Sequence, residues 1–439
     1  MVNRRVFVGS AALWALGSHA SLSAAIRPLS QDVLQTWYGL SLELTRHTAT
    51  FSPPVASRTF AYLGIIAFEA VASGGGALQS LVGQLPGLKS LRLRNVNAKY
   101  DEANVLHGAL QAGIRQLYAH TGPAGQRALK AVGQKLDAEL AVGLSATRLK
   151  RSRSYGEALA NQVLEWSRSD GGADVANMGF PSGYKPADKP GSWKPTSVIR
   201  MQQAPLLPEW GHNRTFVVAS GATCSLPPPP AYSEDKTSEF YKQAFEVYDT
   251  VKKLTPEQRL IARFWADDPM LSPTPPGHWM FIALDILKAK NAGIEDQVDL
   301  MARLGMAVSD AFVACWKSKF EYDLLRPVTY IKRNIDKTWE PILITPPFPE
   351  YPSGHSAQSG AAAAVLTQFF GENFSYEDKT HVRDKLPVRA YISFWDAANE
   401  AGISRLYGGI HFRAGVERGI DQGRCVGAAA NAMKTRRTV

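Results

Sequence analysis

Apolar side chains recur at helical spacing along almost the whole of this 439-residue chain, and no other feature limits the fold as strongly. Strand-like alternation of apolar and polar residues is scarce. We therefore expect an all-α protein. The predicted helices cover residues 31–48, 55–73, 102–120, 124–141, 146–168, 236–253, 256–266, 277–290, 295–320, 354–370, 379–400 and 411–434.

The stretch from Gly171 to Ser233 interrupts this pattern. It is rich in Pro, Gly and Ser and ends in four consecutive prolines at 227–230. Such a composition favours a connection rather than a helix or strand. A connection of this length is either functional or wraps a packed surface. We predict two helical bundles, at 26–170 and 235–439, joined by a connection at 171–234.

The N-terminus has the features of an export signal over residues 1–25. Arg4 and Arg5 precede an apolar run at 8–16, and small residues follow at 21–25. The Arg-Arg-x-Phe order resembles a twin-arginine signal. We expect a periplasmic or secreted, soluble protein, because no later stretch has the ~20 continuous apolar residues of a membrane span. The alternative is a basic terminus on a cytoplasmic protein.

The net charge of +10 comes from basic residues that are scattered along the chain. No basic stripe interleaved with aromatic residues is present, so we do not expect nucleic acid as a partner. An anionic substrate remains compatible with the charge. The three cysteines, Cys224, Cys315 and Cys425, are too few for a disulfide framework and form no Cys-x-x-Cys zinc motif. One disulfide is compatible with export, but the sequence does not pair the cysteines.

Three segments carry candidate chemistry, and the first runs from Lys319 to Pro327. If this segment is helical, Lys319 and Arg326 lie two turns apart on nearly one face, and Pro327 ends or kinks the helix. Two neighbouring cations repel each other unless an anion lies between them. The alternative is a pair of solvated surface cations beside Glu321 and Asp323.

The second segment is Pro352-Ser353-Gly354-His355, followed by an alanine-rich stretch. Ser353 is a suitable helix N-cap, and Gly354 allows an anion to approach the backbone. The free N–H groups at a helix N-terminus bind anions, and His355 can exchange a proton with a bound oxygen. The alternative is an ordinary capped helix with an exposed histidine. The same Pro-Ser-Gly turn occurs at 181–183 without a histidine, so the turn alone is not specific.

The third segment is Ser404-Arg405, followed by Gly408-Gly409 and then His411. Arg405 offers a planar set of donors suited to oxyanions. The glycines break the helix, and His411 opens the next one, where it could act as a nucleophile or a metal ligand. The alternative is a simple helix break beside a core histidine.

Taken together, the three segments resemble the signature of the vanadium haloperoxidase and acid phosphatase superfamily. The surrounding sequence is similar to the haloperoxidases in particular. That context comprises Pro346 to Pro352, Trp316, Phe264-Trp265-Ala266-Asp267-Asp268 and Thr274 to Trp279. The resemblance covers residues 235–435 and extends more weakly to the N-terminal bundle.

The resemblance implies a role for each residue toward a bound vanadate. His411 would bind vanadium, His355 would act as acid and base, and Trp316 and Phe348 would line the halide side. Either Asp267 or Asp268 would pair with Arg405. The vanadate oxygens would be held by Lys319, Arg326, Ser353, Gly354 and Arg405.

The implied reaction is the oxidation of halide to hypohalous acid by hydrogen peroxide, with vanadium as a Lewis acid that keeps its oxidation state. No haem or flavin is expected. Hydrogen peroxide and halide would be the partners, with a small organic acceptor left open and a homodimer as the default assembly. The alternatives are a periplasmic acid phosphatase with His411 as the phosphoryl acceptor, and a non-enzymatic anion-binding helical protein.

One departure from the family pattern concerns the carboxylate that often follows the last histidine by four residues. Here that position is Gly415, which leaves the partner of His411 unidentified. This departure and a resemblance to bacterial members predict a weak oxidant, with iodide oxidised first, bromide possible and chloride poor or absent. The remaining histidines show no ligand spacing and are interpreted as core or surface residues: His47, His107, His120, His212, His278 and His381.

Overall fold

The computed structural model describes residues 29–437, so the predicted export signal lies outside the described residues. Within them, the chain is mostly helical, with one small antiparallel sheet. The α-helices are α1 (Ser30–Arg46), α2 (Pro53–Ala72), α3 (Glu102–Leu117), α4 (Pro123–Ala141), α5 (Ala146–Ser167), α6 (Glu239–Lys252), α7 (Pro256–Phe264), α8 (Thr274–Ala289), α9 (Ile294–Tyr322), α10 (Pro327–Asn334), α11 (Gly354–Phe370), α12 (Phe394–Tyr407) and α13 (Arg413–Asn431).

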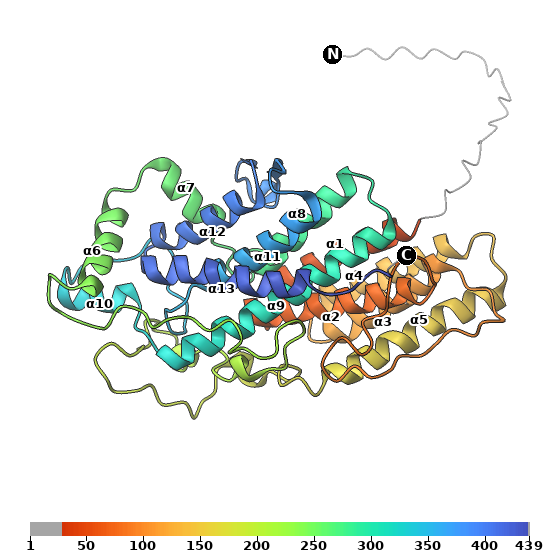
Figure 1. Cartoon of the computed structure of the whole chain (residues 1–439), viewed down its shortest axis with the longest axis horizontal. Coiled ribbons are helices and arrows are strands. Elements are labelled where there is room, and N and C mark those ends of the chain that lie inside the picture. The colour runs from red at the N-terminus through yellow and green to blue at the C-terminus, as the bar shows by residue number, and fades with distance from the viewer. Residues whose placement is uncertain (1–28, 438–439) are drawn as a thin grey trace, which may run out of the picture.

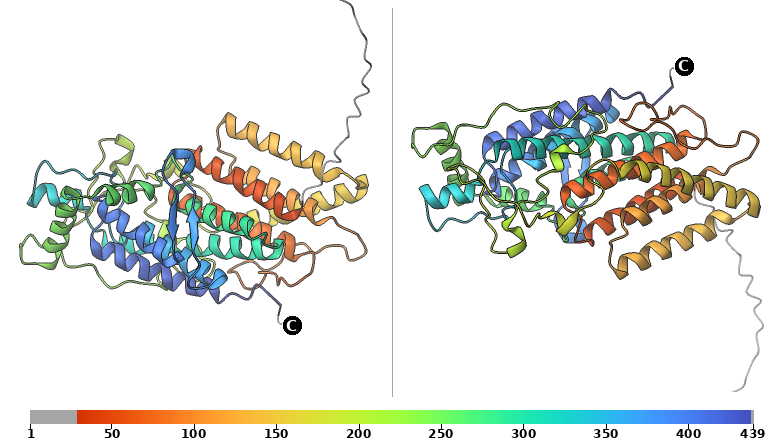
Figure 2. Two further views of the ribbon diagram at one scale, coloured as in Figure 1. Left: turned by 90° about the horizontal axis from the view of Figure 1, so that it is seen from above. Right: turned by 90° about the horizontal axis from the view of Figure 1, so that it is seen from below.

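The 29-residue helix α9 joins the two helical halves of the molecule. It packs on α2 from the N-terminal half and on α11 and α13 from the C-terminal half (Figures 1 and 2). Helices α2 and α9 approach closely because each has a glycine at the contact. A Cβ on Gly64 would lie 2.8 Å from Ala302 Cα, and one on Gly305 would lie 2.7 Å from the Phe60 carbonyl oxygen.

One continuous cluster of buried apolar side chains runs from α1 to α13, so the two helical halves share a core. A second, smaller cluster lies around α6 and α10 and includes Tyr351 and Phe412. These two residues flank the segments predicted to bind the anion. The same apolar burial that stabilises the fold therefore fixes those segments in place.

The predicted helix over 379–400 is wrong. Residues 376–391 instead contain strand β1 (Tyr376–Asp378), the short 3-10 helix η4 (Val382–Asp384) and strand β2 (Arg389–Tyr391), with Tyr376 paired to Tyr391. Helix α12 begins only at Phe394. Pro387 explains the difference, because proline lacks an N–H and disrupts a helix interior.

The prediction that Lys319 and Arg326 share one helix face is also wrong. Helix α9 ends at Tyr322, where Asp323 adopts a left-handed conformation with φ of 44°. Arg326 is the extended N-cap residue of α10, and Pro327 opens that helix, because its fixed φ suits the first helical turn. The chain reverses between the two cations, yet both side chains reach the same buried region.

The connection at 171–234 contains only three short 3-10 helices: η1 (Ala176–Gly179), η2 (Arg200–Gln203) and η3 (Trp210–His212). It wraps a packed surface, since Trp193 N–H donates to the Asp323 carbonyl at 2.8 Å and Leu206 N–H donates to the Pro347 carbonyl at 2.8 Å. The wrapping brings Leu206 to the candidate active site. Helix α2 is long and apolar enough to cross a membrane, but 89% of its apolar window is buried inside the protein.

Cys224 in the connection forms a disulfide with Cys425 in α13, whereas Cys315 is free and buried. The bond closes a loop across a sequence separation of 201 residues. Cross-links between distant residues stabilise a fold by restricting the unfolded chain.

We predict that the double variant Cys224→Ser/Cys425→Ser loses roughly 2–5 kcal/mol of unfolding free energy, measured by denaturant titration. Thiol titration of the denatured wild type should find one thiol before reduction and three after it. Three reactive thiols before reduction would contradict the pairing. The Cys315→Ala variant serves as the control that leaves the disulfide intact.

Candidate active site

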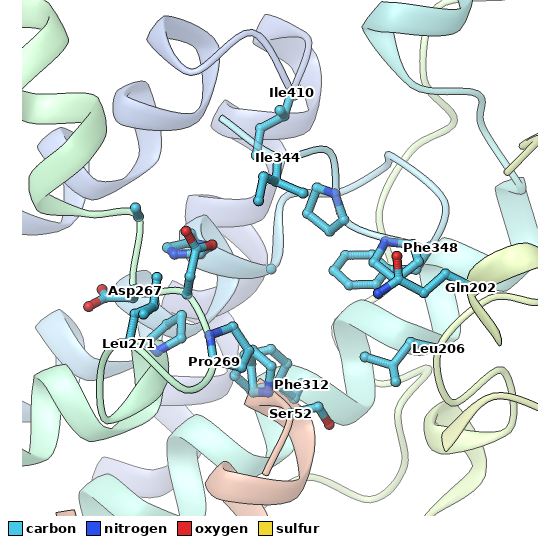
Figure 3. Close-up of a pocket in the computed structure, with 18 of the residues that line it drawn as sticks. Ser52, Gln202, Leu206, Asp267, Pro269, Leu271, Phe312, Ile344, Phe348 and Ile410 are labelled. Atoms are coloured by element: carbon cyan, nitrogen blue, oxygen red, sulfur yellow. The ribbon is translucent and has the colours of Figure 1, made fainter. Parts of the chain in front are cut away.

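A cavity of about 400 Å³ lies where the two helical halves and the 346–348 segment meet. Phe348, Gln202 and Leu206 lie on one side of it, and Asp267 and Leu271 lie on the other (Figure 3). His355, Arg405 and His411 also line the cavity. The structure therefore brings the second and third predicted segments together around one space.

Lys319 is fully buried, and its ammonium group is held by backbone carbonyls. Its Nζ donates to the carbonyls of Pro349 and Glu350, both at 2.9 Å, and also to that of Pro352. An ammonium group has three N–H donors, so these contacts use all of them. Burial, aided by the nearby Arg326 charge, lowers the pKa of Lys319 to about 7. Lys319 thus anchors the 349–352 turn and acts on the cavity through its charge.

Arg326 and Arg405 are buried guanidinium groups that keep donors available. Arg326 donates from Nε to the Phe348 carbonyl at 2.8 Å and from Nη1 to the Ile410 carbonyl at 2.9 Å, while Nη2 has no partner. Arg405, in the last turn of α12, donates from Nη1 to the Trp265 carbonyl at 2.7 Å, and its Nε has no partner. Burial lowers the pKa of Arg326 to about 9 and that of Arg405 to about 10.

His411 is held in a single tautomer by two neighbours. Its Nε2 lies 3.1 Å from Arg326 Nη1, and arginine can only donate, so Nε2 carries the lone pair. Its Nδ1 therefore carries the proton and donates to Glu350 Oε1 at 2.6 Å. Burial, with the Arg326 and Lys319 charges, holds the pKa of His411 well below its usual value. A neutral imidazole with a fixed Nε2 lone pair is the form that ligates a metal.

Glu350 is the carboxylate partner of His411 that the sequence left unidentified. It is fully buried and also accepts the Phe412 N–H at 3.0 Å. Burial raises the pKa of Glu350 to about 7, against the opposing charges of Arg326 and Lys319. The position expected to supply this carboxylate is Gly415, where an added Cβ would lie 2.3 Å from Glu350 Oε1. Glycine at 415 therefore makes room for a carboxylate that arrives from another segment.

Ser353, Gly354 and His355 form the N-terminus of α11, as predicted. Ser353 is the N-cap, and its Oγ accepts the Ser356 N–H at 3.3 Å. His355 Nε2 is buried and has no partner. Burial and the Arg405 charge hold the pKa of His355 well below its usual value, so the ring is neutral and can accept a proton.

Trp316 and Phe348 pack against each other with ring centroids 4.9 Å apart, and both line the cavity. Trp316 Nε1 donates to the Leu206 carbonyl at 3.1 Å. The indole N–H is therefore satisfied, and the ring presents an apolar surface. Lys319 Nζ lies 5.2 Å and Arg326 Cζ 5.0 Å from the Phe348 ring centroid, so this wall lies beside two of the cations.

Buried donors without partners test whether the site fits an oxyanion. Arg326 Nη2 and Arg405 Nε offer N–H groups, and His355 Nε2 offers a proton acceptor. Buried polar atoms normally find partners, and donors of this type suit a tetrahedral or trigonal-bipyramidal oxyanion. Vanadate or phosphate meets this requirement. The His411 Nε2 lone pair accepts a hydrogen bond from Arg326 Nη1 in this structure, and it would bond a vanadium centre once that N–H turns to an oxyanion oxygen.

Neither predicted aspartate forms an ion pair with Arg405. Asp268 acts on Arg405 through its charge without contact, and Asp267 is bonded to His278 and His381. Asp267, His278 and His381 are grouped closely enough to suggest a metal site. An aspartate would repel an oxyanion, however, so this group does not belong to the set of buried cations Lys319, Arg326 and Arg405, which we call the cationic cage.

Sequence reasoning missed Glu350 and the carbonyls that hold the cations. Glu350 could have been noticed, because it is the only acidic residue between Glu340 and Glu372 and it directly precedes the Tyr-Pro-Ser-Gly-His motif. No sequence signal identifies the Trp265 carbonyl as the partner of Arg405, because that contact depends on how α7 and α12 pack.

Comparisons with known proteins identify a matching family model and similar structures. Residues 299–438 match the family model described as the VCPO second helical-bundle domain. The crystal structure of the first bacterial vanadium-dependent iodoperoxidase is similar, with a TM-score of 0.84 and 36% identity over 92% of this chain and 97% of that one. A holo-type bacterial vanadium-dependent chloroperoxidase shares the fold, with a TM-score of 0.69 and 17% identity over 92% of this chain and 95% of that one.

Among curated proteins, the vanadium chloroperoxidase of Curvularia inaequalis is 23% identical over 269 residues. The match covers 46% of this chain and 44% of that protein, so the chain spans less than half the length of that relative.

We predict that Gly415→Ala lowers the unfolding free energy by about 1–3 kcal/mol, because its Cβ would displace the Glu350 carboxylate. Gly39→Ala in α1 is the matched control, since a Cβ there meets nothing within 4 Å. Alanine at this helical position should raise stability by about 0.5–1 kcal/mol. Denaturant titration of both variants checks this difference. An equal gain in stability for Gly415→Ala would show that Glu350 does not occupy that space.

Proposed function

Because this chain belongs to the vanadium haloperoxidase family, we propose that it is a peroxidase that binds vanadate in the cationic cage and oxidises halide with hydrogen peroxide. The observation that carries the proposal is the convergence of unpartnered buried donors on a histidine with a fixed lone pair. A cage of this kind binds an oxyanion and leaves a nitrogen to bond its central atom.

Bound vanadate would supply a Lewis-acidic centre that makes hydrogen peroxide an electrophile toward halide. His411 Nε2 would be the protein ligand to vanadium, with Glu350 holding the ring in the required tautomer. Arg326 and Arg405 would donate to the oxygens from the N–H groups that have no protein partner. Lys319 would contribute positive charge from behind the 349–352 turn while its donors hold that turn.

His355 is positioned to move protons during turnover. The overall reaction, H2O2 + X⁻ + H⁺ → HOX + H2O, consumes one proton. Neutral His355 can take a proton from incoming hydrogen peroxide at Nε2 and return it to the oxygen that leaves as water. An oxyanion bound nearby would raise the pKa of His355 toward neutrality, because negative charge favours the imidazolium form.

Iodide is the proposed halide, with bromide second and chloride poor. Support comes from the bacterial iodoperoxidase that is 36% identical to this chain. The argument from a missing carboxylate at Gly415 no longer applies, because Glu350 bonds His411. The Trp316–Phe348 wall gives halide an apolar surface beside the cationic cage and does not by itself discriminate among halides.

Export to an oxidising compartment is part of the proposal. The Cys224–Cys425 disulfide supports it, because such bonds persist mainly outside the cytoplasm. The paired arginines and apolar run at the N-terminus give independent sequence support.

Substitution of the two cavity histidines should have different effects. We predict that His411→Ala abolishes tight vanadate binding, because the protein–vanadium bond is lost. His355→Ala should retain vanadate and lower turnover about a hundredfold or more, as expected for a missing acid–base group. Calorimetric titration with orthovanadate and assays of iodide oxidation separate the two effects. Equal vanadate affinity in both variants would refute the assigned roles.

Vanadate loading tests the activity itself. Metal-free protein should be nearly inactive, should gain peroxide-dependent iodide oxidation with orthovanadate, and should lose it to excess phosphate. Rates at equal halide concentrations should fall from iodide to bromide to chloride. Full activity without vanadium would end the proposal. Brisk hydrolysis of p-nitrophenyl phosphate by the apo-protein, with no halide oxidation after loading, would favour the phosphatase alternative.

A further inference from the structure

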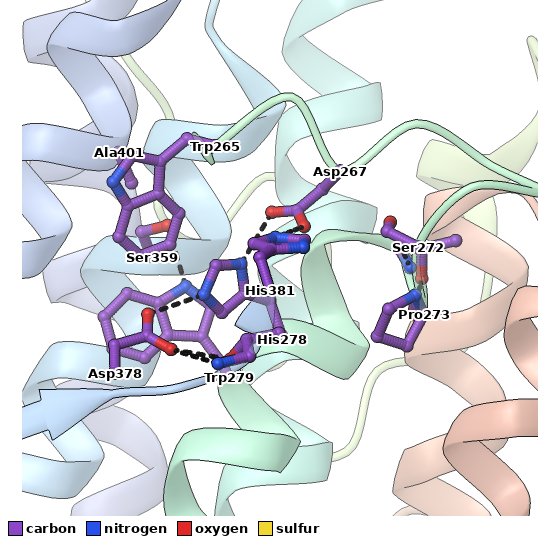
Figure 4. A network of polar contacts seen from close by, with 12 residues as sticks. Trp265, Asp267, Ser272, Pro273, His278, Trp279, Ser359, Asp378, His381 and Ala401 are labelled. Atoms are coloured by element: carbon purple, nitrogen blue, oxygen red, sulfur yellow. Dashed lines mark hydrogen bonds and ion pairs between the residues drawn. The ribbon is translucent and has the colours of Figure 1, made fainter. Parts of the chain in front are cut away.

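Acidic residues and histidines alternate in a hydrogen-bonded row that includes Asp267, a residue that lines the cavity (Figure 4). Asp384 bonds His381 at 3.0 Å, and His381 bonds Asp267 at 3.0 Å. Asp267 then bonds His278 at 2.9 Å, and His278 bonds Asp378 at 2.7 Å. We call these five residues the acid–histidine network. The catalytic roles described above use none of them.

The charges in the network follow from its geometry. Both ring nitrogens of His278 face carboxylate oxygens, which can only accept when ionised, so this ring donates from both nitrogens and is an imidazolium ion. The His381 ring lies between the carboxylates of Asp267 and Asp384. Arg46 adds positive charge through two bonds to Asp384, at 2.8 and 3.1 Å. The Asp267 and Asp378 carboxylates raise the pKa of His278 to about 10, although burial opposes that charge.

The loop that Asp267 belongs to is strained. Asp267, Met270 and Thr274 all have positive φ values, of 48°, 69° and 65°. Positive φ is rare outside glycine and is a genuine outlier for a β-branched residue such as Thr274. Such conformations persist only where the surrounding structure imposes them. The network imposes one here, since both Asp267 oxygens are bonded to rings from α8 and from the turn after β1.

The same loop contacts the cage. The Trp265 carbonyl accepts a hydrogen bond from Arg405. Among the negative charges that raise the pKa of Arg405, that of Asp268 has the largest effect. The Trp265 ring stacks on His278, with centroids 4.4 Å apart and planes 15° apart. His278 therefore touches the loop at Trp265 as well as at Asp267. A displacement of the His278 ring can therefore shift Arg405 through Trp265 alone, because Trp265 contacts both residues.

We propose that the acid–histidine network is a positioning device that holds loop 265–274 in the strained conformation that orients Arg405 for oxyanion binding. Its residues act on the oxyanion through the loop. Asp267 lines the cavity, but both of its carboxylate oxygens are bonded to histidines of the network. The inference deepens the proposed function, since the consequence for vanadate rests on that function. The consequence for the loop does not.

The test replaces His278 by glutamine, which is uncharged and carries its N–H donors on one nitrogen instead of on two sides of a ring. The matched control is His107→Gln, because His107 is also fully buried and bonded to an acid, Asp137 at 3.2 Å, but lies in α3 of the N-terminal half. Two measurements are made on each full-length protein. Hydrogen–deuterium exchange of peptides spanning 265–274 is followed without vanadate, and orthovanadate affinity is measured by calorimetry.

His278→Gln should exchange faster than wild type across 265–274 and should bind orthovanadate about ten- to a hundredfold more weakly, as for other residues that orient a ligand group. His107→Gln should lower the melting temperature without either effect. If His278→Gln does not fold, Asp378→Asn replaces it, because the amide keeps the shape and removes one charge. The same two changes are expected, in smaller measure.

Wild-type exchange and wild-type vanadate affinity in the network variants would overturn the proposal. Stoichiometric Zn²⁺ binding by wild type that is lost in His278→Gln would also overturn it, because the ring nitrogens would then be ligands rather than donors. If wild type itself fails to bind vanadate, the proposed function fails. The exchange of 265–274 then still decides whether the network holds the loop.

Discussion

Burial of three cations beside one cavity is the constraint on which the rest of the structure depends. Arg405 lines the cavity, and Lys319 and Arg326 contact Phe348, which also lines it. Lys319, Arg326 and Arg405 are all nearly inaccessible to solvent, and among residues 29–437 their hydrogen bonds go to backbone carbonyls and to His411 rather than to carboxylates. Removing such charges from water is costly unless polar partners replace it. Backbone carbonyls replace water as the hydrogen-bond acceptors of these cations, and they come from Phe348, Pro349, Glu350, Pro352, Ile410 and Trp265.

Carbonyls inside helices are already bonded to N–H groups of the same helix, so a helical protein must bring irregular segments to its centre to supply free carbonyls. The proline-rich 346–352 segment, the break before α13 and the loop after α7 all meet this need.

The same constraint explains how a single buried acid is tolerated beside the cage. The backbone carbonyl of Glu350 accepts a hydrogen bond from Lys319, which fixes the position of the residue. The side-chain carboxylate of Glu350 accepts a hydrogen bond from His411. One residue thus links the cation that fixes the turn to the histidine that would ligate vanadium. Gly415 completes the arrangement by leaving space for that carboxylate. The acidic partner therefore comes from the segment before α11, and α13 contributes the space at Gly415 and the Gly415 carbonyl, which accepts the Ser353 N–H at 2.8 Å. The fixed tautomer of His411 follows from this packing together with the Arg326 N–H that faces Nε2.

Much of the helical plan could be predicted from the sequence because amphipathic spacing is local. The prediction over 354–370 matches α11, and those for α4 and α5 differ by a residue at most. The helix prediction failed at 379–400, where the apolar pattern outweighed Pro387. It also failed at 319–326, where the break at Asp323 has no strong sequence signal.

The candidate residues His355, Arg405 and His411 do line one cavity. Their partners could not be predicted, since Glu350 and the Trp265 carbonyl reach the site through tertiary packing. His278 and His381 appeared as isolated histidines because their acidic partners lie up to 114 positions away.

The central claim is that the cage binds vanadate with His411 as its protein ligand. The most direct measurement is a crystal structure of the protein soaked in orthovanadate, with anomalous diffraction data to locate vanadium. The account predicts one vanadium peak per chain at bonding distance from His411 Nε2, with its oxygens facing Arg326 Nη2 and Arg405 Nε, the donors that have no protein partner. A peak at Asp267, His278 and His381 instead, or a cage without vanadium at saturating orthovanadate, would contradict it.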